Sequence, residues 1–477
     1  MSGLHDLSVV EQTRQLRSGQ LSAQELLTHY QSRIEEYGES LGAFVTLTPD
    51  LAQAEAAAAD RRLASKTDEP LPPLLGIPLG YKDLHPVKGV VTTFGSRPLR
   101  GFVSDVDGEG VAALRRAGAV TVGTTHAPEF GPTCYTETDV GPRPAVTPYD
   151  TSRYASGSSG GAAAAVAAGL LPAAHASDGA GSIRTPASVC GLVGFKPSRG
   201  RAPVTASSFV SWTVEGPIAR TVADAALLAG VLAPGSPHDL YRIESPDEAS
   251  LAAGPLQVLA YSDTGIGDCD PEVLTAFNDA VRALEELGHE VCVAPNPRPW
   301  DDALVGAMLG VFASTVTATS RRMVPRERWP ELRQFTRWCI EAVAGLDSAD
   351  FVLSQAMLAQ AAGAHAAAAR HYDAVLTPTA AGPAQVVGAF DAEDLQGSVR
   401  RMLEWSAFTP PANMTGAPAL QLPVALSSDG LPLGVQLCGR RPGADATVLT
   451  LGAALEHALA WDHHPAQWYV PTLASER

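Results

Sequence analysis

One lysine and two serines lie in segments where their side chains could attack a carbonyl compound. Lys82 ends an apolar run, Ser158 lies in a Gly/Ser segment, and Ser182 lies in a Gly/Ala turn. A serine hydroxyl needs a positioned base before it can attack a carbonyl carbon. A lysine can replace histidine as that base when burial lowers its pKa and leaves the amine neutral. The order of the three residues predicts a Ser-Ser-Lys amide hydrolase, in which Lys82 takes the proton of Ser182 through Ser158.

The turn around Ser182 also carries backbone groups that suit this reaction. Residues 177–184 are Ser-Asp-Gly-Ala-Gly-Ser-Ile-Arg, which predicts a tight turn with several unpaired N–H groups. Such donors stabilise the oxyanion of a tetrahedral intermediate, each contributing roughly 3–4 kcal/mol when well placed. We therefore expect an oxyanion hole built from the backbone N–H groups of Gly179, Ala180, Gly181 and Ser182.

Each segment taken alone has an ordinary explanation. A lone lysine in an apolar run such as 76–82 is most often a surface residue whose stem packs on its neighbours. A Gly/Ser cluster such as 156–161 is most often a flexible loop. A Gly-x-Gly-Ser turn can also start a helix or hold a phosphate. The functional interpretation rests on the occurrence of all three segments in one chain.

The three segments belong to a longer stretch, from Gly76 to about Pro217, that resembles the amidase signature family almost throughout. Further shared motifs lie at residues 92–96, 128–131, 183–188, 191–198 and 215–220. Weaker similarity covers nearly the whole chain, through residues 376–379, 413–419 and 430–436. The resemblance implies an enzyme that hydrolyses carboxamides through a seryl acyl-enzyme and needs no cofactor.

The resemblance also implies a role for each residue of the site. Ser182 matches the family's acyl-accepting nucleophile, Ser158 its bridging serine and Lys82 its general base. The family's bridging serine follows a cis peptide bond, which here is the bond between Gly157 and Ser158. Ser159 would help to orient the lysine and the bridging serine.

Two charged residues flank the turn that carries Ser182. Asp178 and Arg184 resemble structural supports of this turn in the family, although either could instead be an ordinary surface charge. We therefore expect them to support the site without reacting.

The chain departs from the family pattern at three small residues. Ser156 and Ala162 replace a glycine and a serine of the usual second motif, and we expect the turn to survive because Ser156 is small. Ala180 lies between two glycines of the nucleophile turn. If that position needs a positive φ, alanine strains it by roughly 1 kcal/mol or more. None of these changes removes a catalytic atom.

Periodicity along the chain predicts an α/β fold. Apolar residues three and four apart predict helices over 8–17 and 22–37, each with serine at its N-cap, and an Ala-rich helix over 51–64. Short apolar runs at 119–123 and 171–176 predict buried strands, which alternate with helices over 110–116 and 162–169.

With the family resemblance, this pattern predicts a single domain over residues 1–477, with a central twisted mixed β-sheet covered by helices on both faces. Within it we expect N-terminal helices over 1–65 that pack on the core and a catalytic signature region over 76–220. Residues 301–349 are the least similar to the family, and related enzymes build the substrate pocket there. The aromatic residues of this region could line that pocket, although core packing is the commoner role for each.

The composition of the chain argues against some classes of binding partner. The net charge of −17 argues against a nucleic acid or an anionic membrane bound through a basic patch. The six cysteines lack the close pairs of a zinc site or the density of a disulfide scaffold, so we expect reduced thiols, no metal and a cytoplasmic location. His126 and His175 lie near the motifs, but neither has a carboxylate at a spacing that suggests a catalytic triad. The sequence is compatible with a homodimer.

The substrate is predicted as a small linear, cyclic or aryl amide. Residues 174–178 and 191–201 are especially similar to cyclic-oligoamide hydrolases of the nylon-oligomer type within the family. One alternative is the glutaminase subunit of a tRNA-dependent amidotransferase, but its Glu-Val-Lys-Arg-Arg pattern is absent, since residues 338–342 are Trp-Cys-Ile-Glu-Ala. Another alternative is a catalytically silent binding module, against which the intact Lys82, Ser158 and Ser182 argue.

Overall fold

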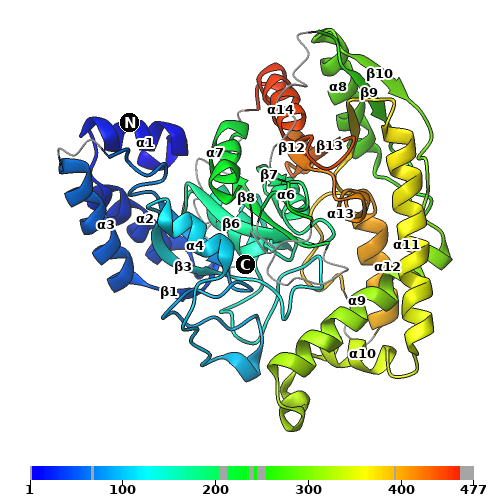
Figure 1. Ribbon diagram of the computed structural model, residues 1–477, viewed down its shortest axis with the longest axis horizontal. Coiled ribbons are helices and arrows are strands. Elements are labelled where there is room, and N and C mark those ends of the chain that lie inside the picture. Colours follow the sequence, from blue (N-terminus) through cyan, green and yellow to red (C-terminus); the bar gives the residue numbers. More distant parts are fainter. Residues whose placement is uncertain are drawn as a thin grey trace, which may run out of the picture.

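The computed structural model of the 477-residue chain describes residues 3–65, 69–202, 212–233, 235, 241–243, 254–390 and 394–461. Helices and strands alternate along most of it, and Figure 1 shows their arrangement. The strands are β1 (Phe44–Leu47), β2 (Pro78–Lys82), β3 (Val120–Thr125), β4 (Val146–Thr147), β5 (Asp150–Tyr154), β6 (Ala173–Asp178), β7 (Val193–Lys196), β8 (Val214–Ala219), β9 (Gln257–Ala260), β10 (Glu290–Val293), β11 (Ala374–Pro378), β12 (Ala419–Leu426) and β13 (Pro432–Gly439).

The helices cover and flank these strands. The α-helices are α1 (Val9–Ser18), α2 (Ala23–Tyr37), α3 (Pro49–Ala64), α4 (Glu109–Arg116), α5 (Gly160–Ala167), α6 (Arg184–Val189), α7 (Val222–Leu232), α8 (Pro271–Glu286), α9 (Asp302–Met323), α10 (Gln334–Ala342), α11 (Ser348–Ala369), α12 (Leu395–Ser406), α13 (Pro410–Thr415) and α14 (Asp445–Leu459). Short 3-10 helices are η1 (Leu4–Asp6), η2 (Arg97–Leu99) and η4 (Arg326–Glu331).

An 11-stranded mixed sheet runs through the molecule in the order β1-β3-β2-β6-β8-β7-β12-β13-β11-β9-β10. Strands β3, β2 and β6 are mutually parallel, as are β11, β9 and β10, and antiparallel pairs connect the two groups. The predicted α/β class and mixed central sheet are confirmed. Because β2 and β6 are neighbours, the ends of both strands deliver residues to one place.

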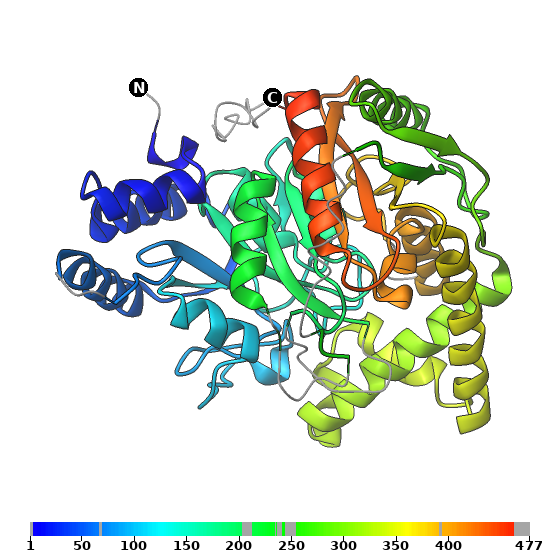
Figure 2. The same ribbon diagram turned by 45° about the horizontal axis from the view of Figure 1, so that its top comes forward.

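Helices pack against the sheet in two groups. Helices α4, α7, α14 and α8 contact one another in a row, and α7 and α14 are seen side by side in Figure 2 as the green and red helices in front of the sheet. Helices α5 and α6 form a second group that contacts the strands and each other. Every residue of α5 is buried, which its glycine, alanine and valine side chains allow.

The N-terminal helices form as their local sequence predicts. The hydroxyl oxygens of Ser8 and Ser22 each accept a hydrogen bond at 3.1 Å from the backbone N–H of the residue three positions later, which caps α1 and α2. Buried apolar residues of each helix, such as Val9 and Leu16 of α1 and Leu26 and Leu27 of α2, face the core. Both predicted N-caps are confirmed.

Helices α10 and α11 each pack on α9, and the three helices lie beside the main body in Figure 1. By length and composition α9 is apolar enough to cross a membrane, and 44% of its most apolar window is buried inside the molecule. Its buried face joins Trp300 and Leu358 in an apolar cluster. Helices α9 and α10 lie within residues 301–349, the region for which the sequence predicts a pocket.

Candidate active site

Lys82 ends β2 with its ammonium nitrogen inside the protein. Its side chain is 1% exposed, and Nζ donates hydrogen bonds to Oγ of Ser158 at 2.9 Å and to the carbonyl oxygen of Ser177 at 3.0 Å. Burial lowers the pKa of Lys82 to about 7, although the charge of Asp178 opposes this shift. A large fraction of this lysine is therefore neutral near neutral pH and able to accept a proton, unlike a lysine at the surface.

Ser158 lies in a constrained turn before α5. The Gly157–Ser158 peptide bond is cis, as the family resemblance implies. Of the departures from the family pattern, Ser156 has a positive φ, of 59°, whereas Ala180 does not. Ala180 therefore carries no left-handed backbone strain. Ser156 does adopt a left-handed conformation, and its hydroxyl donates to the carbonyl oxygen of Cys134 at 3.0 Å.

Ser159 shares an acceptor with the lysine. Its hydroxyl donates to the carbonyl oxygen of Ser177 at 3.4 Å, the same oxygen that accepts from Nζ of Lys82. Its side chain is fully buried. This position fits the predicted role of orienting the lysine, through a carbonyl group that both side chains contact.

Asp178 and Arg184 form a fully buried ion pair beneath the turn that carries Ser182. Nε and Nη2 of Arg184 each lie 2.9 Å from a carboxylate oxygen of Asp178. Burial opposes ionisation of the carboxyl, yet the guanidinium of Arg184 holds the pKa of Asp178 well below its usual range. Both residues therefore brace the turn, and the alternative of ordinary surface charges is excluded by their 0% exposure.

Two residues from the C-terminal part of the chain complete this brace. Nδ2 of Asn413 donates to the carbonyl oxygen of Asp178 at 2.9 Å and to Oδ1 at 3.0 Å. Oγ1 of Thr409 donates to the carbonyl oxygen of Ala180 at 2.6 Å. The sequence alone assigned neither residue a role, although the family-like motif at 413–419 marked one of the two segments. The turn is thus held from both sides by hydrogen bonds.

The predicted oxyanion donors do not all remain available. The N–H of Gly181 donates to Oδ1 of Asp178 at 2.7 Å, and φ of Gly181 is 134°. The prediction that Gly181 offers a free N–H is therefore wrong, because the supporting carboxylate already accepts from it. Within the described part of the chain, the N–H groups of Gly179, Ala180 and Ser182 have no hydrogen-bond acceptor. These three can point at a substrate oxygen.

A cavity of about 230 Å³ adjoins the turn. Ser158 and Ser182 both line it, together with the turn residues and with Ser177, whose carbonyl oxygen accepts from Lys82. No hydrogen bond joins the two serine hydroxyls among the described residues, and contacts of this kind often tighten only when substrate is bound. The structure therefore brings Lys82, Ser158 and Ser182 to one pocket and links the first two directly.

The walls of the cavity are mainly apolar, with some threonine and serine side chains, and carry no charged side chain among the described residues. The apolar lining comes chiefly from Phe130, Trp212, Met308, Leu309, Val311, Phe312, Val316, Phe335, Cys339, Val399, Met402 and Leu403. Much of it belongs to α9, α10 and α12, and Phe312 and Phe335 are aromatic residues of 301–349 that line the cavity. The assignment of 301–349 to a substrate pocket stays a prediction. Trp300, which comes directly before this region, packs in a core cluster, with its ring N–H donating to the carbonyl oxygen of Ala407 at 2.9 Å.

Glu129 ties this wall to the signature region. Its carboxylate accepts from the hydroxyl of Ser96 at 2.7 Å, from the backbone N–H of Arg333 at 2.8 Å and from the hydroxyl of Thr336 at 2.5 Å. Burial raises the pKa of Glu129, and these donors partly offset the shift. The start of α10 is thereby fixed against the segment that contains the Pro128–Gly131 motif.

The histidines weighed as alternative bases lie away from the cavity lining. His126 is buried between the carbonyl oxygen of Gly42 at 3.0 Å and the hydroxyl of Thr138 at 2.7 Å, and burial lowers its pKa to about 4. His175 contacts Glu215, a partner that sequence spacing did not suggest. Neither histidine lines the cavity that contains Ser182.

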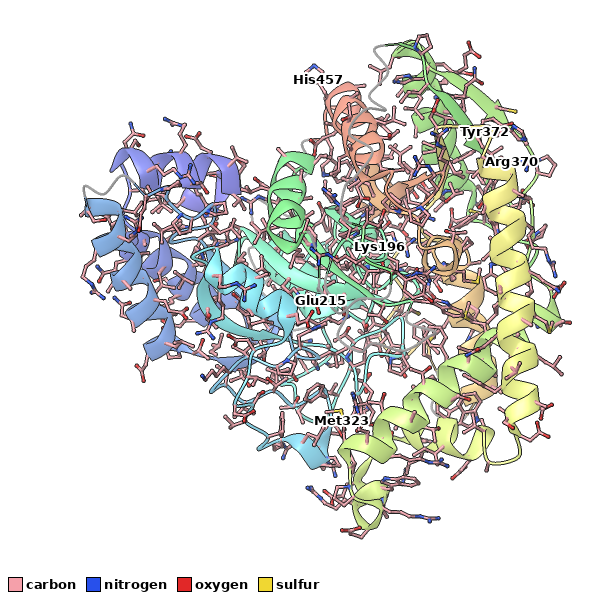
Figure 3. The ribbon with its side chains drawn as sticks, viewed as in Figure 1. Lys196, Glu215, Met323, Arg370, Tyr372 and His457 are labelled. Carbon is pink, nitrogen blue, oxygen red and sulfur yellow. The ribbon has the colours of Figure 1, made fainter. Side chains whose placement is uncertain are left out.

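A second buried lysine offers a contrast with Lys82. Lys196 ends β7, and burial lowers its pKa to about 7 as well. Its Nζ donates to the carbonyl oxygen of Pro197 at 2.9 Å, and it does not line the cavity. Figure 3 labels Lys196 and Glu215 in the middle of the molecule, away from Met323 at the end of α9. A lowered lysine pKa alone therefore does not identify the site.

Comparison with known proteins identifies the family. The chain matches the family model described as Amidase over residues 25–449, and it belongs to that family of amide-hydrolysing enzymes. It is 33% identical over 476 residues to an acylamidase of Rhodococcus erythropolis, covering 97% of this chain and 98% of the relative. It is also 34% identical over 501 residues to a subunit of the glutamyl-tRNA(Gln) amidotransferase from Desulforapulum autotrophicum, covering 95% and 97%.

Solved structures give the same result for the whole chain. A 6-aminohexanoate cyclic dimer hydrolase complexed with substrate superposes with a TM-score of 0.86 at 28% identity, covering 98% of this chain and 100% of the other. A bacterial aryl acylamidase superposes with a TM-score of 0.87 at 27% identity, covering 99% and 100%. The chain is therefore an amidohydrolase with a single amidase-signature domain, as the sequence resemblance implies.

Proposed function

We propose that the protein hydrolyses small, uncharged carboxamides with Ser182 as nucleophile. Lys82, neutral before attack, accepts a proton from Ser158, which in turn accepts the proton of Ser182 as its Oγ bonds to the carbonyl carbon. The oxyanion is held by the N–H groups of Gly179, Ala180 and Ser182. The proton then passes back to the leaving amine, and water hydrolyses the acyl-enzyme by the same route.

The observation that carries this proposal is the hydrogen bond of 2.9 Å between Nζ of buried Lys82 and Oγ of Ser158, at the wall of the cavity that Ser182 lines. The separate support for Ser182, from Asp178 and Arg184 beneath its turn, allows the nucleophile to be held without using the lysine. The base and the oxyanion donors are therefore positioned by different contacts.

The pocket favours an apolar acyl or amine portion. A cavity of about 230 Å³ suits a small organic group, and its aromatic and aliphatic walls offer no partner for a charge. We therefore propose linear, cyclic or aryl amides with an uncharged apolar body near the scissile bond. The named substrates of the cyclic dimer hydrolase and the aryl acylamidase belong to those proteins and only suggest which amides to test first.

Free glutamine is a poorer fit to the same walls. Its amino and carboxylate groups would need charged partners, and the described lining supplies none. The identity of 34% to an amidotransferase chain is matched by the identity of 33% to an acylamidase. The uncharged lining therefore supports the proposal of an uncharged amide over glutamine, whereas sequence identity favours neither.

A panel of amides tests the proposal. Purified protein is assayed with hexanamide, acetanilide, a cyclic amide dimer and glutamine, with Ser182→Ala as the blank. We expect turnover of at least one uncharged amide, none in the blank, and glutamine the poorest substrate. Hydrolysis of glutamine alone would overturn the proposed substrate class, whereas undiminished turnover in Ser182→Ala would overturn the mechanism.

A further inference from the structure

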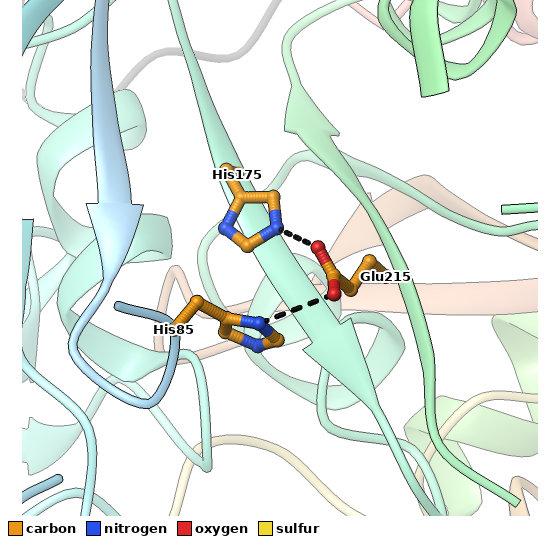
Figure 4. Close-up of side chains that lie close together, drawn as sticks. All are labelled: His85, His175 and Glu215. Carbon is orange, nitrogen blue, oxygen red and sulfur yellow. Dashed lines mark hydrogen bonds and ion pairs between the residues drawn. The ribbon is translucent and has the colours of Figure 1, made fainter. Parts of the chain in front are cut away.

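Three buried side chains meet in the interior at a second place. His175 of β6 and Glu215 of β8 lie on neighbouring strands, and His85 reaches them from the turn after β2 (Figure 4). Nε2 of His175 lies 2.8 Å from Oε2 of Glu215, and Nδ1 of His85 lies 3.3 Å from Oε1. We call these residues the His-Glu cluster.

The cluster lies across the sheet from the proposed active site. The rings of Tyr81 and His175 have centroids 6.0 Å apart, which places His175 on the same side of the sheet as Tyr81. Successive residues of a strand point to opposite faces, so Lys82 points to the other side. Glu215 lies opposite Ser177 in the pairing of β6 with β8, so the two side chains share a face of the sheet. Because His175 lies two residues before Ser177 on the same strand, it shares that face as well. None of the three cluster residues lines the substrate cavity.

The donor atoms have the type and spacing of a metal site. One ligand atom from each of the three residues can be chosen so that all lie within 4.8 Å of one another. Two imidazole nitrogens and one carboxylate oxygen form a set that zinc accepts, with metal–ligand distances of about 2.0–2.2 Å. Ligands at those distances lie roughly 2.8–3.6 Å apart around one ion. The separations of 2.8 and 3.3 Å from the two histidines to Glu215 fall in that range, and the two histidine nitrogens lie within 4.8 Å of each other.

The surroundings hold the donors in place. The three side chains are at most 2% exposed, so little solvent competes for the ligand atoms. Nδ1 of His175 has no hydrogen-bond partner among the described residues. The polar contact of this ring is therefore the one that its Nε2 makes with Glu215. A Cβ at Gly110 would lie 1.9 Å from Oε2 of Glu215, so the first turn of α4 rests directly on the carboxylate.

We infer that His85, His175 and Glu215 bind one divalent metal ion, zinc in preference to magnesium, with water as a further ligand. The ion cross-links three elements: the turn that follows Lys82 at the end of β2, strand β6, which carries the carbonyl group of Ser177, and strand β8. Its role is structural, because it lies outside the cavity. Nitrogen ligands favour zinc, whereas magnesium prefers oxygen atoms alone.

Metal analysis of the untagged full-length chain tests this inference. Protein from zinc-supplemented cells, purified without chelator, is measured by inductively coupled plasma mass spectrometry. We expect about one zinc per chain and at least about a tenfold loss in Glu215→Gln and His175→Gln, because each removes one of three ligands. His126→Gln is the matched control, since His126 is also a buried histidine but lies outside the cluster, and it keeps the metal.

A second measurement does not depend on the folding of the variants. Dipicolinate treatment of the wild-type chain lowers its melting temperature, and zinc chloride restores it where magnesium chloride does not. The inference is overturned if wild-type protein supplied with zinc, manganese, cobalt, nickel or ferrous iron carries less than about a tenth of an equivalent of each, or if Glu215→Gln keeps its zinc. Neither readout uses amide turnover, so the result is independent of the role of Ser182.

Discussion

The turn that carries Ser182 and the wall that faces it are built by opposite physical means. The turn rests on a fully buried ion pair between Asp178 and Arg184, surrounded by hydrogen bonds. The wall, from α9, α10 and α12, consists mainly of apolar side chains and carries no charge among the described residues. Ion pairs with several hydrogen bonds fix atoms in one geometry, whereas apolar contacts tolerate exchange of side chains. Chemistry and substrate choice are therefore encoded in separable parts of the molecule.

The largest effect is expected at the nucleophile. Ser182→Ala removes the attacking oxygen while leaving the Asp178–Arg184 brace intact, so amide turnover falls by about 10⁴-fold or more with an unchanged fold. Steady-state assays with a circular dichroism spectrum check this. If turnover survives in a folded variant, the turn is not where the chemistry lies.

The second prediction compares the kcat of variants at the two buried lysines. Lys82→Met removes the proposed base, and we expect kcat to fall by about 10³-fold because proton transfer to Ser158 is lost. Lys196→Met is the control, as it removes an equally buried lysine that donates to the carbonyl oxygen of Pro197 and does not line the cavity, although its charge acts on Asp178 and Arg184. We expect its kcat to stay within about tenfold of the wild-type value. Equal losses in both variants would show that kcat reports the loss of a buried lysine rather than of a base.

The brace is expected to control stability more than chemistry. Arg184→Met leaves the carboxylate of Asp178 buried without its partner, which costs about 3–5 kcal/mol of unfolding free energy. Chemical denaturation measures this loss. A change below about 1 kcal/mol would contradict a buried pair, since that is the size expected for an exposed one.

The pH dependence follows from the lowered pKa of Lys82. The lysine acts as a base only when deprotonated, so kcat/KM falls about tenfold per pH unit below the pKa of about 7 and levels off above it. Profiles from pH 5.5 to 9 test this sign. A profile that stays flat through this window would leave the lysine without a role as base.

The smallest effect is expected at the wall. Phe312→Ala enlarges the cavity, and we expect kcat/KM for an anilide to fall about tenfold while that for acetamide changes by less than about twofold. Trp300→Phe keeps a ring in the adjacent core but not in the cavity lining, and it serves as the control. Equal losses for both amides would place Phe312 in the support of the turn rather than in substrate choice.

Local sequence predicted much of this arrangement. Serine N-caps and apolar spacing located α1 and α2, and the family-like motifs placed Lys82, Ser158 and Ser182 in one pocket. The rest depends on contacts between residues far apart in the chain. Asn413 lies 235 residues from Asp178, and no local pattern signals that its amide supports that carboxylate.

At two positions of the site the structure differs from the prediction for a local reason that the residue types alone do not reveal. The N–H of Gly181 is used by Asp178, three residues earlier, because the turn folds back on the end of β6. The left-handed backbone lies at Ser156 rather than at Ala180. The His-Glu cluster was not predicted, because His85 and Glu215 meet only through the order of strands in the sheet.

Covalent labelling tests the central claim most directly. The purified protein is treated with a serine-directed fluorophosphonate, weighed intact by mass spectrometry and digested to map the adduct. The account predicts a single adduct per chain, on Ser182, that disappears in Ser182→Ala and forms far more slowly in Lys82→Met. An adduct on another serine, or none in a folded sample that hydrolyses amides, would contradict the assignment of Ser182 as the nucleophile.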